Sequence, residues 1–229
     1  MDGPRHLGGL EGLFLVRLRP GSKAAVDADW PRLRLACSDL ADHRGNVGLL
    51  LGPVYPCGGG ILELDIDNPE GLTPTLDALR AAGLEADAVI HSGGEHRGWK
   101  VLFWVRAPAW AWTWPHGCEI PDVDVRGAGC QCVIPPSAVE VPYTWTVPLP
   151  PMPDLLRRGE DRPEDFEARL YHCLYGCDPL EAPCSDDGAP LPETLPEDLR
   201  RVLEALAAAG LRFQGRHGPT AQLTEECLL

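Results

Sequence analysis

The chain has no long hydrophobic segment, and no secretory signal is expected from its first residues. None of its apolar runs reaches the roughly 18 residues that a membrane-spanning helix needs. The first residues, Met1 to His6, do not show the basic and then apolar order of a secretory signal. These absences predict a soluble, cytoplasmic protein that does not bind membranes.

Lysine is scarce in this chain. Of the 20 lysine and arginine residues, only Lys23 and Lys100 are lysines. An ammonium group is a compact point charge, whereas a guanidinium group is a planar fork. In a chain that uses arginine almost everywhere, a retained lysine indicates a position that needs the point charge. Retention by chance is the alternative for each of the two.

Several common binding motifs are also missing. Gly21-Ser22-Lys23 lacks the earlier glycine that a phosphate-binding loop requires. Pro69 stands at the third ligand position that an EF-hand loop would need, which excludes such a loop. The nine cysteines include no Cys-x-x-Cys pair and are scattered, unlike those of a small secreted disulfide framework. Most of them are predicted to be reduced thiols in the core.

Two groups of cysteine and histidine residues offer a competing hypothesis of zinc binding. The groups are His172, Cys173, Cys177 and Cys184, and His116, Cys118, Cys130 and Cys132. Cys173 and Cys177 are one helical turn apart, so they can equally face a core. Because neither group has a paired spacing, we do not expect zinc.

The net charge of −14 argues against a nucleic-acid partner, because basic surfaces drive phosphate binding. The charge is unevenly distributed, however. Residues 1–150 hold 18 acidic and 12 basic side chains, a net charge of −6. Bound metal ions would offset the negative charge of the acids that cluster in this part of the chain. The acidity therefore weakens the nucleic-acid hypothesis without excluding it.

The most informative segment is a β-type run over residues 61–67. Side chains alternate across a strand, so one face of this run carries three acids and the other three aliphatic residues. The acids are Glu63, Asp65 and Asp67, and the aliphatic residues are Leu62, Leu64 and Ile66. One face can pack against a core while the other holds metal.

A further acid, Asp124, follows in a second strand-like segment. Two carboxylates about 7 Å apart along one strand, joined by a third from another strand, suit two divalent ions that clamp a reacting phosphate. The pattern points to phosphoryl or nucleotidyl transfer. An isolated Asp-x-Asp pair can also be an ordinary strand ending, so the segments have to be considered together.

The predicted elements alternate between strands and helices, which indicates an α/β or α+β sheet with helices on one side. Strands are expected over residues 13–18, 46–52, 61–67, 86–91, 99–105, 123–127 and 131–134, with the second and third as neighbours. Helices are expected over residues 30–42 and from Thr73 to Gly83, where Thr-Pro is a favourable start and glycine a favourable stop.

The composition changes after Trp145. Four prolines between residues 148 and 153 predict a stiff linker over residues 148–162. Helices are predicted over residues 163–176 and 194–210, the second opened by Thr194 and Glu197 at capping-box spacing. The chain is thus divided into a main domain (1–147), a Pro-rich linker (148–162) and a helical C-terminal extension (163–229).

Six short segments of the main domain occur together in a characteristic order. They are Asn46-Val47-Gly48 with Gly52, Leu64–Gly71, Ser92-Gly93-Gly94 leading to Lys100–Phe103, Asp124–Gly127, Gln131–Ser137 and Tyr143–Trp145. Over roughly residues 10–147 the chain resembles the N-terminal domain of bifunctional DNA primase/polymerases. These are plasmid- and phage-associated prim-pol proteins of the archaeo-eukaryotic primase superfamily. The resemblance implies an α+β fold: an RRM-like core with a mainly antiparallel sheet, here followed by a small helical tail.

The resemblance also implies a catalytic centre. Asp65 and Asp67 match the family's first catalytic motif and Asp124 its third, which together would hold two Mg²⁺ or Mn²⁺ ions. The second motif usually has a histidine that contacts the nucleotide's phosphates. Here the strand alignment places Lys100 at that position, and His96 on the preceding loop is the second choice. A solvated loop histidine is the plain alternative for His96.

Other residues fall at family-like positions near the nucleotide. Arg126 shares a face with Asp124 and suits a phosphate, although a salt bridge that orients Asp124 is the alternative. Lys23 resembles an early lysine of the family or is a surface residue. The remaining candidate nucleotide-binding residues are Ser92, Gln131, Ser137 and Asn46.

The expected function is DNA-templated nucleotidyl transfer, as primase or DNA polymerase, on a single-stranded template with dNTPs or NTPs. The resemblance implies replication of a phage, plasmid or other mobile element, and a replicative helicase in cis or in trans as a partner. Two alternatives remain at this point. One is a metal-dependent nuclease that uses the same acids, and the other is a catalytically silent nucleic-acid-binding module.

Overall fold

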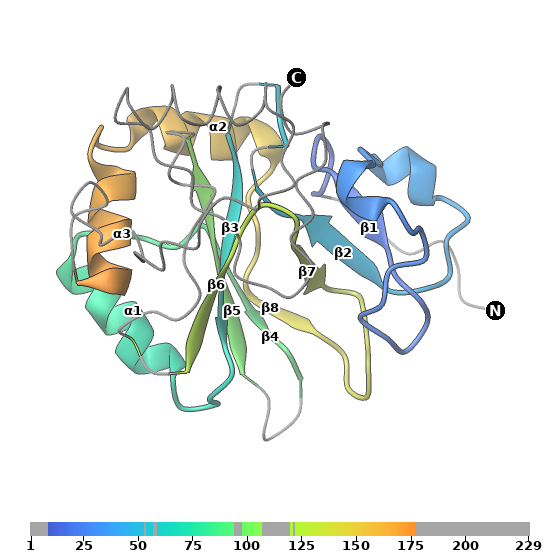
Figure 1. The fold of residues 1–229 in the computed structure, drawn as a ribbon, viewed down its shortest axis with the longest axis horizontal. Coiled ribbons are helices and arrows are strands. Elements are labelled where there is room, and N and C mark those ends of the chain that lie inside the picture. The colour runs from blue at the N-terminus through green and yellow to red at the C-terminus, as the bar shows by residue number, and fades with distance from the viewer. Residues whose placement is uncertain are drawn as a thin grey trace, which may run out of the picture. The chain divides into compact units, whose positions relative to one another are not determined.

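The computed structural model describes residues 9–52, 54–56, 59–93, 98–106, 120 and 122–176. Strands in these residues form two separate sheets, ordered β1-β2-β7 and β6-β3-β5-β4-β8 (Figure 1). Their bounds are β1 Leu15–Arg17, β2 Val47–Leu50, β3 Gly60–Ile66, β4 Ala88–His91, β5 Trp99–Val105, β6 Val123–Arg126, β7 Gln131–Ile134 and β8 Thr144–Val147. Each of these pairings is antiparallel, which confirms the predicted α+β class.

Strand β3 lies in the interior of the five-stranded sheet and is buried along its whole length. It pairs with β6 on one side and β5 on the other. As the alternation predicts, Leu62, Leu64 and Ile66 lie on one face and Glu63 and Asp65 on the other. Both faces of β3 are therefore covered.

The aliphatic face of the sheet packs against helices. Helix α1 spans Leu72–Ala81 and ends before Gly83, whose φ is 72°, so the predicted helix and its glycine stop are confirmed. Helix α3 spans Phe166–Tyr175, and Phe166 packs on Phe103 of β5 with ring centroids 6.3 Å apart. Among the helices of the described part, none is long and apolar enough to cross a bilayer.

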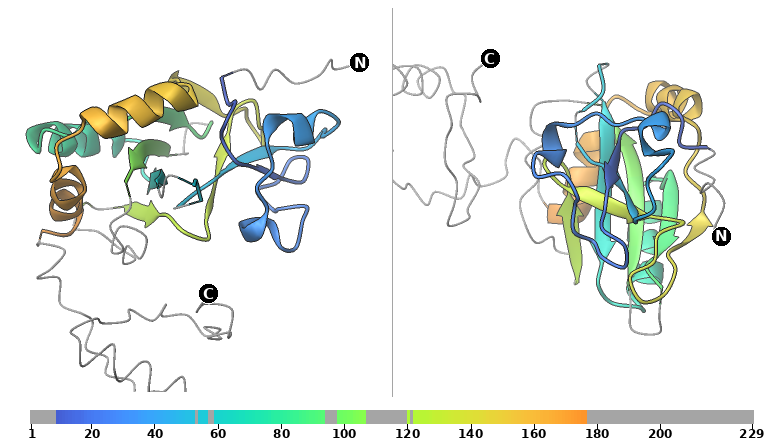
Figure 2. Two further views of the ribbon diagram at one scale, coloured as in Figure 1. Left: turned by 90° about the horizontal axis from the view of Figure 1, so that it is seen from above. Right: turned by 90° about the vertical axis from the view of Figure 1, so that its right-hand side faces the viewer.

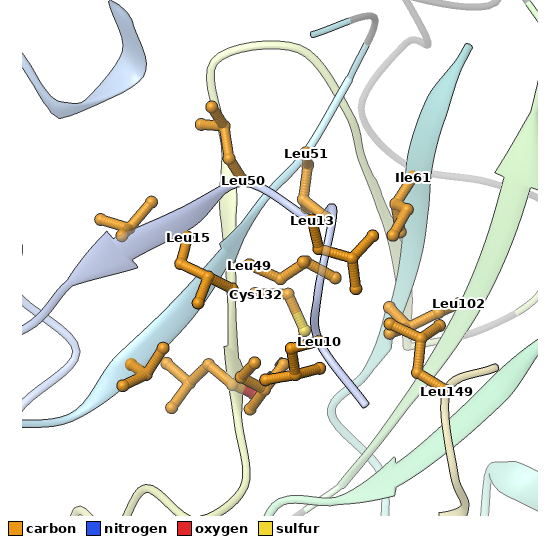
Figure 3. Packing of buried hydrophobic residues seen from close by; sticks show 14 of the residues in the cluster. Leu10, Leu13, Leu15, Leu49, Leu50, Leu51, Ile61, Leu102, Cys132 and Leu149 are labelled. Atoms are coloured by element: carbon orange, nitrogen blue, oxygen red, sulfur yellow. Dashed lines mark hydrogen bonds between the residues drawn. The ribbon is translucent and has the colours of Figure 1, made fainter. Parts of the chain in front are cut away.

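The other face of the sheet looks toward the three-stranded sheet. Figures 1 and 2 show β1 and β2, in blue, on the side of the five-stranded sheet opposite α1 and α3. Between the two sheets lies a shared hydrophobic core, in which Leu49 and Cys132 pack near Ile61 and Leu102 (Figure 3). The charged side chains of β3 therefore point into a space between two sheets, beside an apolar core.

The predicted helix over residues 30–42 is wrong. The segment forms two 3₁₀ turns, Trp30–Arg32 and Cys37–Leu40, separated by extended backbone. Leu35, between the turns, bridges to Leu15 of β1, and its carbonyl accepts a 2.8 Å hydrogen bond from the Leu15 N–H. Pairing with β1 therefore overrides a helical spacing of apolar residues that is genuine in the sequence.

The prediction that residues 46–52 and 61–67 are neighbouring strands is also wrong. Strand β2 belongs to the smaller sheet and β3 to the larger one, and an isolated bridge from Gly52 to Ile61 joins their ends. Strand β8, which the sequence patterns did not predict as a strand, pairs with β4 at the edge of the larger sheet. Its residues are mostly exposed, so they lack the apolar alternation of a buried strand.

Part of the predicted linker is helix α2, Met152–Asp161. Its prolines stand at the N-cap and in the first turn, where no intrahelical N–H is needed. Leu155 is fully buried in the core, and Gly159 lies so close to Trp104 that an added Cβ would be 2.8 Å from the indole ring. The predicted helix 163–176 corresponds to α3, whereas the predicted helix 194–210 lies outside the described residues. The division into three domains stays a prediction.

A buried carboxylate fastens α2 to the sheet. Asp87, which is 1% exposed, accepts a 2.6 Å hydrogen bond from the Trp104 N–H of β5. It also accepts a 2.8 Å bond from Arg162, the residue that follows α2. Arg158 within α2 lies 3.5 Å from the other oxygen of the same carboxylate. One aspartate thus accepts a hydrogen bond from a strand N–H and forms ion pairs with two arginines.

Replacement of Asp87 by alanine should destabilise the protein by about 2–4 kcal/mol, because Arg162 and the Trp104 N–H lose their buried partner. Chemical denaturation of the native and variant chains measures this change. Asp161→Ala, which removes an exposed acid from the end of α2, is the control and should change stability by less than about 0.5 kcal/mol. Equal effects of the two substitutions would contradict the assignment of Asp87 as the residue that joins α2 to the sheet.

Candidate active site

Five charged side chains from three adjacent strands share the face that looks toward the smaller sheet. Across the β3–β6 pair, Asp65 lies opposite Asp124 and Glu63 opposite Arg126. Across the β3–β5 pair, Asp65 lies opposite Lys100. Residues directly opposite in an antiparallel pair project from the same face. We call Glu63, Asp65, Lys100, Asp124 and Arg126 the charged face.

Asp65 is the centre of this face. Its Oδ1 lies 2.8 Å from the Nζ of Lys100, and its Oδ2 lies 2.6 Å from the Nη2 of Arg126. The Lys100 ammonium also lies 2.5 Å from Oε1 of Glu63. Both oxygens of the Asp65 carboxylate are therefore engaged by cations, one on each side of β3.

The two cations differ sharply in their access to solvent. The Lys100 side chain is 3% exposed, and its partners Glu63 and Asp65 are 0% and 7% exposed. The Arg126 side chain is 36% exposed. A ligand that approaches from solvent can reach the guanidinium of Arg126, whereas the ammonium of Lys100 lies beneath the carboxylates.

Burial and charge compete in setting the protonation of the pair. Burial acts to lower the pKa of Lys100, but the nearby negative charge of Glu63 and then of Asp65 outweighs it and raises the pKa above its ordinary value. Lys100 therefore stays protonated at neutral pH. Burial raises the pKa of Glu63 even though Lys100 acts in the opposite direction.

Arg126 responds in the same way as Lys100. Burial acts to lower its pKa, but the negative charges of Asp65, Glu63 and Asp124 raise it. Across the sheet interface, burial raises the pKa of the Cys132 thiol of β7 well above its ordinary value, and Glu63 adds to that effect. Cys132, which lies against the charged face, is therefore a neutral thiol.

The other predicted acids lie toward solvent. Asp67 is one residue past β3 and exposed, and its N–H donates a 3.0 Å hydrogen bond to the Asp122 carbonyl. Asp124 is half-buried. The structure thus brings Asp65 and Asp124 directly together across two strands and places Asp67 at the end of the same strand.

The donor chemistry of these acids suits Mg²⁺ or Mn²⁺, which prefer carboxylate oxygens. Among the described residues, no three histidine, cysteine, aspartate or glutamate side chains converge closely enough to hold a metal ion as they stand. Arg126 occupies the Oδ2 of Asp65 that points toward Asp124's strand. An ion shared by Asp65 and Asp124 would compete with that guanidinium, so the metal site stays a prediction.

Two residues predicted to bind nucleotide are held in the fold's own hydrogen bonds. Ser137 is fully buried, and its Oγ both accepts from the Val47 N–H at 2.8 Å and donates to the Val47 carbonyl at 3.0 Å. Asn46, 2% exposed, donates to the carbonyls of Ser22 and Ala138 and accepts from the Ala138 N–H. Both residues fasten the segment after β7 to β2.

The remaining predicted residues take part in hydrogen bonds to loop carbonyls or lie outside the description. Ser92 closes the loop between β4 and β5 with a 2.6 Å hydrogen bond to the Gly98 carbonyl, and His96 lies outside the described residues. The Gln131 side chain donates to the carbonyl of Lys23, whose own side chain is exposed. The zinc hypothesis rested largely on residues outside the description, among them Cys177, Cys184, His116 and Cys118.

Glu63 shares a face with Asp65 in the sequence pattern, but the pattern predicts no role for it. The role of Glu63 depends on the register of β5. This register sets Lys100 opposite Asp65 and two residues along β5 from Leu102, the residue opposite Glu63. An acid two residues before Asp65 and a lone lysine in a facing strand were the available signals.

Comparison with known proteins adds one finding. A family model described as bifunctional DNA primase/polymerase, N-terminal, matches residues 10–155. No curated protein matches the chain. The matched segment contains the whole charged face, together with Asn46 and Ser137.

The hydrogen bonds of Ser137 lead to a test of its role. Ser137→Ala should lower the free energy of unfolding by about 1–3 kcal/mol, because the buried Val47 N–H loses its acceptor. Thermal or chemical unfolding measures the change, and Ser38→Ala, at an exposed serine, is the matched control. A variant with native stability but weakened nucleotide binding would instead support direct contact between Ser137 and the nucleotide.

Proposed function

We propose DNA-templated nucleotidyl transfer on a single-stranded template as the function of this chain, which belongs to the family of bifunctional DNA primase/polymerase N-terminal domains. Family membership implies DNA primase/polymerase activity in general, with DNA and nucleotides as substrates. One observation supports the more specific proposal. Asp65 and Asp124 face each other on adjacent strands beside a solvent-accessible arginine.

The proposed site uses three carboxylates to hold divalent ions. Asp65, Asp124 and Asp67 would supply the oxygen ligands. When bound, Mg²⁺ or Mn²⁺ would lower the pKa of an attacking 3′-hydroxyl and neutralise charge on the pyrophosphate leaving group. The chain's own task is to orient these carboxylates, and the antiparallel register of β3 and β6, which sets Asp65 opposite Asp124, supports this role.

Arg126 is the proposed phosphate contact. Its guanidinium is the more exposed of the two cations on the charged face and has several N–H donors for phosphate oxygens. The Asp65 oxygen that it now occupies would become free for a metal ion when the guanidinium moves to a triphosphate. Nucleotide binding and metal binding would then support each other at one carboxylate.

The wider context is also part of the proposal. We propose a primer or template strand and dNTPs or NTPs as substrates, and a replicative helicase of a phage, plasmid or other mobile element as a partner. A nuclease that uses the same acids is the second candidate. The engagement of both Asp65 oxygens by cations favours a third, a DNA-binding module without catalysis.

Substitution of Asp124 by asparagine should reduce nucleotide incorporation by about 10³-fold or more, because several kcal/mol of transition-state stabilisation depend on the metal that it would hold. Asp65→Asn should have a similar effect. The assay supplies single-stranded template with and without a labelled primer, dNTPs or NTPs, and Mg²⁺ or Mn²⁺. Asp77→Asn, at an exposed position of α1, is the control and should keep native activity.

The outcomes separate the three functions. Extension that is lost in both active-site variants supports the polymerase, and products without a primer add primase activity. Shortened strands that appear without nucleoside triphosphates would indicate the nuclease. A folded native chain that binds DNA but incorporates no nucleotide with either metal would contradict the proposed function and favour the binding module.

A further inference from the structure

Lys100 is one of only two lysines in the chain, and it lies in an unusual place for a lysine. Long charged side chains are almost never fully buried unless they are paired. Here the side chain is 3% exposed, and its ammonium lies between Oε1 of Glu63 at 2.5 Å and Oδ1 of Asp65 at 2.8 Å. The burial and the two short contacts show that Lys100 is committed to these two carboxylates.

The register of the sheet fixes this arrangement. Asp65 lies directly opposite Lys100 across the β3–β5 pair, and Glu63 is displaced by one same-face position along β3. All three side chains emerge from buried stretches of strand. Strand pairing thus fixes the backbone of Lys100, and two carboxylates hold its ammonium group. The ammonium therefore has little freedom to reach a ligand in solvent.

We propose that Lys100 and Glu63 are positioning residues that act as a pair on the catalytic carboxylate of Asp65. Lys100 fixes Oδ1 of Asp65, so that Oδ2 is the oxygen turned toward Arg126 and the strand of Asp124. Glu63 shares the ammonium, so that Lys100 does not neutralise Asp65 completely. This inference rests on the proposed function, because it assigns a role in metal binding at the same site.

The pair explains why this position carries lysine in an arginine-rich chain. A compact ammonium with three donors fits between two carboxylates of one strand, whereas a planar guanidinium would present a wider fork. The phosphate contact that the family resemblance implied for Lys100 then belongs to the more exposed Arg126. Lys100 acts through Asp65 and does not touch the nucleotide.

Mn²⁺ binding in the absence of nucleotide and DNA tests the proposal without relying on catalysis. Lys100→Met keeps the length of the side chain but removes its charge. Removal of a positive charge near a cation site should by itself strengthen Mn²⁺ binding, whereas loss of positioning should weaken it. We expect affinity to fall by about tenfold or more, as is typical when a partner of a metal ligand is removed. Calorimetric titration with Mn²⁺ measures this change.

The double variant Glu63→Gln with Lys100→Met separates positioning from folding. Removal of both charges of a buried pair often leaves stability close to native, whereas removal of one is strongly destabilising. We therefore expect the double variant to recover stability relative to Lys100→Met but to keep its weakened Mn²⁺ affinity. Asp77→Asn with Arg80→Met, at an exposed ion pair of α1, is the control and should leave both measurements unchanged.

Three results would overturn the proposal. Native Mn²⁺ affinity in the double variant would show that the pair does not position Asp65. Unchanged Mn²⁺ affinity in Lys100→Met, combined with a raised KM for nucleotide, would make Lys100 a phosphate contact. Absence of Mn²⁺ binding in the native chain would remove the basis of both proposals. A native chain that binds Mn²⁺ and shows the expected variant effects but incorporates no nucleotide would contradict the proposed function alone.

Discussion

The Lys100 ammonium, buried between Glu63 and Asp65, is the interaction on which the arrangement of the site depends. Three carboxylates on one face of adjacent strands repel one another, and two of them are almost fully removed from water. Burial of such groups is unfavourable unless cations pair with them. Lys100 supplies a positive charge in the interior, and Arg126 supplies a second one nearer the surface. These charges allow the acids to lie beside a hydrophobic core.

The two-sheet architecture makes this concentration of charge possible. The aliphatic face of β3 packs toward α1 and α3, which leaves the opposite face free to carry acids. The smaller sheet covers that face in part, with Cys132 opposite Glu63 and Lys100. Asn46 and Ser137 join β2 to the segment after β7, so the cover is itself held in place by buried hydrogen bonds. These hydrogen bonds thus help to hold together the sheet that partly covers the charged face.

The sequence predicted the parts of the fold whose signals are local. The alternation of acids and aliphatic residues correctly assigned both faces of β3, and Gly83 correctly marked the end of α1. The helix begins at Leu72 with Gly71 as its N-cap, just before the predicted Thr-Pro start. The failures arose where long-range pairing decides the structure. Leu35 lies within the segment 30–42 that the spacing of other apolar residues predicted as a helix, but it pairs with β1. The prolines near residue 150 start a helix that Asp87 joins to the sheet.

The same distinction applies to the candidate site. The three acids and Arg126 were predicted from residue type and spacing, and the register of β3 and β6 brings Asp65, Asp124 and Arg126 together. The contact of Lys100 with Glu63 could not be predicted, because it depends on which residue of β5 stands opposite Asp65. A pattern along one strand indicates which residues share a face, but only the pairing of strands shows which of them touch.

The two-sided burial of β3 has a consequence for how this site can change. Every residue of the strand from Gly60 to Ile66 is buried, and neighbouring positions serve opposite surfaces. A slip of one residue in its pairing with β5 and β6 would turn the acids toward the helices and the leucines toward the site. The alternation of side chains along β3 thus specifies both the charged face and the helix-packing face, so an insertion or deletion that changes one face also changes the other.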